Sequence, residues 1–149
     1  MVPTLIKPQM WQRWRVAQRL ALLATFGDSI TGTRVKAFCQ GLSRDLGADC
    51  RIIEHVWLFS TFRLHELQEI AAEEASASDL IIISVHESDS LPDEVKSWID
   101  LWLRQKGTHR AVLLALLDPA YQGSSSSIRR YLQEVARRGG MEFLVEGED

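Results

Sequence analysis

The sequence has no asparagine, only two cysteines and no long apolar run, and each absence narrows what the protein can be. Cys39 and Cys50 lack the spacing of a metal-binding pair, so we expect reduced thiols in a cytoplasmic protein. The longest apolar runs, such as Ala111–Leu117, are far too short to cross a bilayer. No signal-peptide core follows the N-terminal basic residues either. We therefore expect no transmembrane segment.

An excess of positive charge is also missing. The formal net charge is −3, so nothing in the composition favours nucleic acid as a partner. At 149 residues the chain fits one domain that can bury a core without disulfides or metal. Pro3 and Pro8 oppose regular structure near the N-terminus, which predicts an arm over residues 1–15 and one domain over residues 16–149.

Five short apolar segments, each followed or preceded by a helical stripe, predict an alternating α/β protein. The strands are expected at 20–26, 50–57, 80–85, 111–117 and 141–145. The run at 80–85 has no polar alternation, which is typical of a central strand covered on both faces. The predicted fold is a three-layer sandwich with a five-stranded parallel sheet in the flavodoxin-like order 2-1-3-4-5.

In such a sheet, ligands bind where the carboxyl ends of the strands meet, between strands one and three. The segments expected there are 27–34, 58–61, 86–90, 118–123 and 146–149. The candidate ligand-binding residues are Asp28, Ser29, Thr31, Gly32, Thr33, Arg34, His86, Glu87, Asp118 and Tyr121. They combine hydroxyls, turn-forming backbone and both signs of charge.

The run Phe26-Gly27-Asp28-Ser29-Ile30-Thr31 resembles the first block of the GDSL (SGNH) hydrolases. The resemblance implies that Ser29 is a nucleophile and that Gly27 contributes to an oxyanion site. A serine needs a base to take its proton. The family's late Asp-x-x-His is missing here, and so is the oxyanion asparagine. Only His86 stands at a strand end from which it can reach Ser29.

Ser29-Ile30-Thr31-Gly32-Thr33-Arg34 resembles the phosphate loop of flavodoxins, with Arg34 in place of the last threonine. The resemblance implies FMN as a cofactor, with Tyr121 as one aromatic wall. Hydroxyls and a helix amino terminus do favour an anion. The alternative is that Ser29, Thr31 and Thr33 turn the chain and cap the following helix. We favour capping, and we expect no resident cofactor.

A third resemblance is to response-regulator receivers, which share this topology. The run 79–85 resembles their third strand, but Ser84 stands where the phosphorylated aspartate belongs and Glu146-Gly147 where a lysine belongs. This implies at most a receiver-like module that is not phosphorylated. Four carboxylates at the strand ends are weak candidates for a Mg²⁺ site, namely Asp28, Glu87, Asp89 and Asp118. We expect them to be solvated and to hold no metal.

Trp98 and Trp102 lie one turn apart on the predicted third helix, with Leu101 off their stripe. The spacing favours core packing against the sheet. Tryptophan is also enriched at interfaces, so the alternative is a homodimer, or binding of another protein, through Trp98, Leu101 and Trp102. That alternative predicts that Trp102→Glu gives a soluble monomer.

No complete catalytic constellation is present in the sequence. We therefore expect a non-enzymatic binding or regulatory module with a ligand crevice at the carboxyl edge of the sheet. The alternatives are a small hydrolase with Ser29 as nucleophile and a flavin- or phosphate-binding protein that uses residues 29–34.

Overall fold

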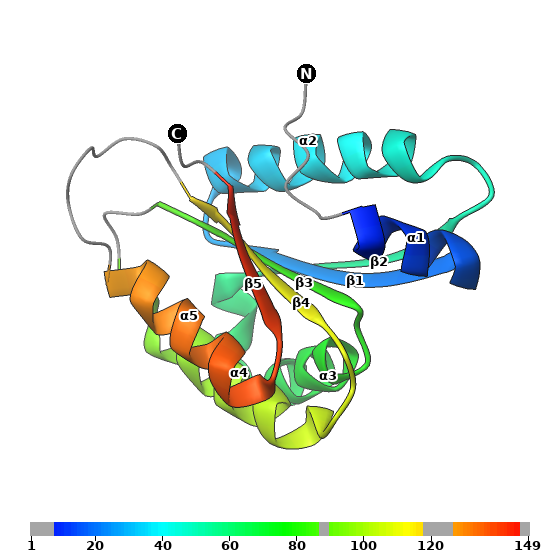
Figure 1. Ribbon diagram of the computed structural model, residues 1–149. Helices are drawn as coiled ribbons and strands as arrows, with labels where there is room; N and C mark the ends of the chain where they lie inside the picture. The colour runs from blue at the N-terminus through cyan, green and yellow to red at the C-terminus, as the bar shows by residue number, and fades with distance from the viewer. Residues whose placement is uncertain (1–7, 87–89, 118–126, 147–149) are drawn as a thin grey trace.

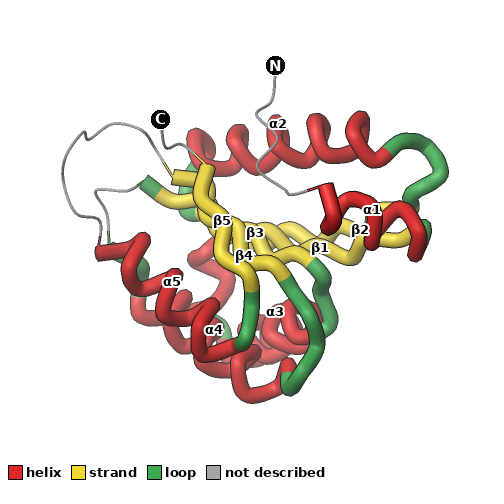
Figure 2. The backbone as a smooth tube through the Cα atoms, in the orientation of Figure 1, coloured by secondary structure: helices red, strands yellow, loops and turns green. Residues whose placement is uncertain are grey.

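The computed structural model describes residues 8–86, 90–117 and 127–146 of the chain. Its centre is a sheet of five parallel strands in the order β2-β1-β3-β4-β5 (Figures 1 and 2). The strands are β1 (Arg19–Phe26), β2 (Arg51–Leu58), β3 (Leu80–Val85), β4 (Val112–Leu117) and β5 (Glu142–Glu146). The predicted fold class and strand order are confirmed.

Helices cover both faces of this sheet. On one face lie α1 (Pro8–Ala17) and α2 (Ser29–Leu46), and on the other lie α3 (His65–Ser76), α4 (Asp93–Lys106) and α5 (Ser127–Gly139) (Figure 1). The chain moves outward from β1 to β2 and then returns past β1 to β3. Because each crossover is right-handed, this reversal places α2 and the later helices on opposite faces.

Alternating strand residues divide the interior into two cores. Leu22 of β1 and Ile82 of β3 pack with Val35 and Phe38 of α2. The neighbouring residues of the same strands belong to the other core, beneath α3, α4 and α5. All six residues of β3 are buried, as are all six of β4. The continuous apolar runs therefore belong to central strands, as expected for a parallel sheet.

The two tryptophans of α4 belong to the core. Trp98 and Trp102 are both 0 % exposed, and the Trp98 ring stacks on Phe62 with 4.7 Å between centroids. The structure therefore shows the core alternative, and neither indole is on the surface to meet a partner. Leu101 is half-buried beside the same core. Trp102→Glu would place a charge in the interior instead of separating a dimer.

Residues 8–17 form helix α1, where the prolines had predicted an irregular arm. Pro8 occupies the first helical position, at which a missing N–H removes no intrahelical hydrogen bond. Trp14 is 2 % exposed and packs with Leu20 and Leu22 of β1. Helix α1 thereby helps α2 to cover this face of the sheet. In the described ranges, no helix is both long and apolar enough to cross a membrane.

Candidate functional site

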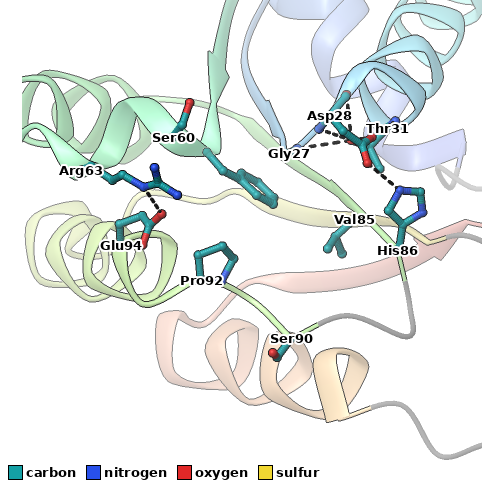
Figure 3. A pocket seen from close by; sticks show the side chains of 11 residues that line it. Gly27, Asp28, Thr31, Ser60, Arg63, Val85, His86, Ser90, Pro92 and Glu94 are labelled. Atoms are coloured by element: carbon teal, nitrogen blue, oxygen red, sulfur yellow. Dashed lines mark hydrogen bonds and ion pairs between the residues drawn. The ribbon is translucent and has the colours of Figure 1, made fainter.

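A pocket of about 380 Å³ lies at the carboxyl edge of the sheet (Figure 3). At this point the connections that follow β1 and β3 lead to helices on opposite faces of the sheet. Gly27, Asp28 and Thr31 follow β1, and Phe59, Ser60 and Arg63 follow β2. Val85 ends β3 and His86 follows it, Ser90 and Pro92 precede α4, and Glu94 lies in the first turn of α4. The prediction that the segments after the first three strands meet at one edge is confirmed.

Asp28 occupies this pocket as the N-cap of α2. Its backbone is extended, with φ −148°, and its carboxylate accepts from the Thr31 backbone N–H at 2.8 Å. The Thr31 hydroxyl donates to the same carboxylate at 2.9 Å and accepts from the Asp28 backbone N–H at 3.0 Å. These reciprocal bonds form a capping box in which threonine replaces the more usual glutamate.

His86 completes the surroundings of Asp28. Its Nε2 lies 2.8 Å from Oδ2 of Asp28, and the two side chains point toward each other (Figure 3). The Thr31 backbone N–H, followed by His86, lowers the pKa of Asp28 to about 2. The carboxylate is therefore ionised at neutral pH, and it joins the end of β1 to the end of β3.

A second charged pair, Arg63 and Glu94, forms the opposite wall. Arg63 ends the 3₁₀ helix η1 (Phe59–Arg63), and its Nε donates to Glu94 at 3.0 Å. The arginine side chain is 72 % exposed, whereas that of Glu94 is 20 % exposed. The backbone N–H of Glu94 and the Arg63 guanidinium both lower the pKa of this carboxyl group. This wall therefore holds a second ionised carboxylate, that of Glu94, beside the Arg63 guanidinium.

The buried Gln68 side chain keeps this wall in place. Its amide nitrogen donates to the carbonyls of Phe62 and Glu94, at 3.1 and 3.3 Å. One side chain of α3 thereby joins η1 to the first turn of α4. Gly27 permits a close approach on the other side, because a Cβ there would lie 3.0 Å from the Phe59 ring. The pocket thus has apolar surface between its two charged pairs.

The hydroxyls that resemble a phosphate loop are already bonded within α2. Thr31 serves the capping box, and the Thr33 hydroxyl donates to the Ser29 carbonyl at 2.8 Å. Gly32 lies against Phe26, since a Cβ would come within 2.7 Å of that ring. The structure therefore shows Thr31 in the capping role, whereas the Thr33 hydroxyl bonds back to the preceding turn of the helix. The Asp28 carboxylate holds the amino terminus of α2, where a phosphate would otherwise bind.

Ser29 and Arg34 are not among the residues that line the pocket. Ser29 is exposed in the first turn of α2, and Nε2 of His86 contacts Asp28. Arg34 acts electrostatically on Glu146 at the end of β5, where it opposes the rise in the pKa of Glu146 that burial produces. The candidate residues 28–34 therefore divide between the pocket and the flank of α2.

Several predicted site residues lie outside the described part of the chain. These are Glu87, Asp89, Asp118 and Tyr121. Among the residues that the structure does describe, no cluster of three or more histidine, cysteine, aspartate or glutamate side chains could hold a metal ion. The weak metal prediction for Asp28 with Glu87 and Asp118 stays a prediction.

Sequence reasoning missed Arg63 and Glu94. The expected segment after strand two ended at residue 61, and the one after strand three ended at residue 90. The sequence signal for Arg63 is that it follows strand two closely. The run Phe59–Arg63 forms a 3₁₀ helix, which carries Arg63 to the pocket. No known protein-family model matches this chain, and no curated protein matches it.

Proposed function

We propose that the protein is a binding module that holds a small polar ligand with an acidic group in the carboxyl-edge pocket. The observation that carries this proposal is the pairing of Asp28 with His86 on one wall and of Arg63 with Glu94 on the other. A volume of about 380 Å³ is in the range of small-molecule sites. The position at the switch point of the strand order supports the same function.

The two walls offer different chemistry to such a ligand. Arg63 donates to Glu94 through Nε, and its guanidinium carries further N–H donors, for which a carboxylate or phosphate is the best-matching acceptor. Ser60 and the ionised Asp28 supply hydrogen-bonding groups at the other positions. Phe59 and Pro92 contribute apolar contact. This arrangement favours a molecule with an anionic end and a hydrogen-bond-donating end.

The test is a titration monitored by backbone amide NMR with three probe classes: simple dicarboxylates, phosphomonoesters and zwitterionic amino acids. We expect a binding probe to shift the amides of Gly27, Ser60 and His86. Arg63→Gln should weaken that binding about tenfold or more, since a hydrogen bond to a charged group is involved. Shifts confined to other parts of the chain would refute the site.

Arg137→Gln is the matched control, because Arg137 is an equally exposed arginine that pairs with Glu134 on α5. It should leave the affinity unchanged. Equal effects of the two arginine substitutions would contradict the proposal.

Hydrolysis of p-nitrophenyl acetate that disappears in Ser29→Ala would replace the proposed binding function with an enzymatic one. A visible flavin absorbance in the purified protein would replace it with an FMN-dependent function.

A further inference from the structure

The outer edge of β2 carries apolar side chains that the rest of the described chain does not cover. β2 is the first strand in the sheet order, and from Ile53 to Leu58 its residues alternate between half-buried and exposed. Val56 is 48 % exposed and Leu58 is 46 % exposed. Long edge strands of this kind are unusual, because their free N–H and C=O groups invite another strand to pair.

The backbone of β2 shows which groups are available for pairing. The Arg51 N–H donates to the Gln18 carbonyl, and the Trp57 carbonyl accepts from the Thr25 hydroxyl of β1. Odd-numbered residues therefore direct their backbone groups toward β1. Because this direction alternates along a strand, Ile52, Glu54, Val56 and Leu58 direct theirs outward.

A groove adjoins this edge on the α2 side of the sheet. It has a volume of about 550 Å³, and its lining includes Lys36 of α2 with Glu54 and Val56 of β2. On the opposite side, Glu74 of α3 contacts both Trp57 and His55. A strand added to this edge would therefore lie beside Lys36 and Glu54 on the α2 face of the sheet.

We propose that β2 pairs antiparallel with β2 of a second copy, about a two-fold axis at His55. This register sets Ile52 opposite Leu58 of the second copy and Ile53 opposite Trp57 of the second copy. Each outward-facing residue then meets an outward-facing residue, as hydrogen-bonded antiparallel pairs require. The result is one continuous ten-stranded sheet across two chains.

Side-chain charge selects the second copy as occupant and selects this register. Glu54 falls opposite Val56 of the second copy, and Val56 shares its groove with Lys36. Each copy thus presents Lys36 to the Glu54 of the other. Moving the axis to Glu54 would set two carboxylates face to face, which destabilises a strand pair. Moving it to Val56 would shorten the ladder and leave Ile52 unpaired.

Sedimentation equilibrium over a wide concentration series tests the pairing. The wild-type chain should dimerise reversibly, and Val56→Lys should raise the dissociation constant at least about tenfold. Val56→Pro should do the same, because it removes an outward N–H and no hydrogen bond to β1. Ile30→Lys is the control, since Ile30 is 62 % exposed on α2. A wild-type monomer at every concentration, or equal weakening by Ile30→Lys, would overturn the proposal.

Cross-linking tests the register. In an antiparallel pair without hydrogen bonds, the two Cα atoms are about 4.5 Å apart, which a disulfide can span. His55→Cys should therefore form a disulfide-linked dimer under mild oxidation, whereas Glu54→Cys should not. The native Cys39 and Cys50 are buried and should stay reduced. Faster cross-linking of Glu54→Cys than of His55→Cys would show that the proposed register is wrong.

Discussion

An aspartate lies beside a histidine at the carboxyl ends of the strands, and another such pair lies at their amino ends. The two pairs have different surroundings. At the carboxyl edge, Asp28 and His86 face a pocket. At the amino edge, Oδ1 of Asp79 lies 3.5 Å from Nε2 of His109, and Oδ2 accepts from the Ala21 N–H at 3.0 Å. The same two residue types thus take part in a candidate site at one edge and in strand attachment at the other.

The backbone around Asp79 explains the difference. The Asp79 N–H donates to the Ala21 carbonyl, and the Val112 N–H donates to the Asp79 carbonyl. Asp79 therefore joins the first residues of β1, β3 and β4 to one another. The connections after β1 and β3 leave the opposite edge on different faces of the sheet, which opens the space that Asp28 faces. A pair of residues makes a site only where the topology leaves room for a ligand.

The largest expected effect is at the amino edge. Asp79→Ala removes the acceptor of a partly buried backbone N–H of β1, which should lower the free energy of unfolding by about 1–3 kcal/mol. Urea denaturation measures this change. His109→Ala should cost less than about 1 kcal/mol, because the His109 side chain is 41 % exposed. If Asp79→Ala is neutral in stability but abolishes ligand binding, the comparison of the two edges is wrong.

The next effect is at the carboxyl edge. Thr31 is 2 % exposed, and its hydroxyl serves the Gly27 and Asp28 backbone N–H groups. The isosteric Thr31→Val should therefore cost about 1–2 kcal/mol of unfolding free energy. Thr33→Val is the control, because its exposed hydroxyl bonds the Ser29 carbonyl and takes no part in the capping box. Equal losses from both substitutions would contradict a special role for the capping box.

A third prediction concerns the pH dependence of the Asp28 contribution. The folded-state pKa of about 2 is below the ordinary value of 3.8, so ionised Asp28 stabilises the fold above pH 3.8 and loses this effect as the pH falls toward 2. Asp28→Asn keeps a capping oxygen but removes the charge. Its stability deficit relative to wild type should shrink over that window, measured by urea denaturation. A deficit that is constant across the window would exclude this charge effect.

The smallest effect should be visible only in a titration. His86→Ala removes one of the groups that lower the pKa of Asp28, so that pKa should rise. It should stay below 3.8, because the Thr31 N–H remains the largest cause of the shift. NMR titration of the Asp28 carboxyl group measures this change. His109→Ala should leave the same titration unmoved, and any shift there would show that the two edges are coupled.

Several elements could be predicted from the sequence with little error. The strand at 80–85 coincides with β3, because a run rich in β-branched residues is bounded by the polar residues Asp79 and His86. The helix expected around Trp98 and Trp102 begins at Asp93, directly after Pro92, since proline fixes φ and its missing N–H removes no intrahelical hydrogen bond at that position. Gly47 ends α2 with φ 85°, a conformation that glycine adopts without strain.

Other features depended on contacts between distant segments. Helix α1 forms where two prolines predicted an irregular arm, because Trp14 gains burial against β1 that outweighs a weak local preference. The spacing of Trp98 and Trp102 suited both a core and an interface. Burial under η1 and α3 decided between them, since Phe62 comes from a segment far away in sequence.

The strands, their parallel order and the sheet edge that is open to a ligand follow from the amino-acid sequence alone. Alternation of apolar runs with amphipathic stripes is a local property, and the handedness of the crossovers then restricts the topology. Which polar residues share the pocket depends on the three-dimensional fold, because Arg63 and Glu94 meet through η1 and α4 and neither carries a local signal of the other. The charges of a site are determined by such long-range contacts, whose geometry no local pattern encodes.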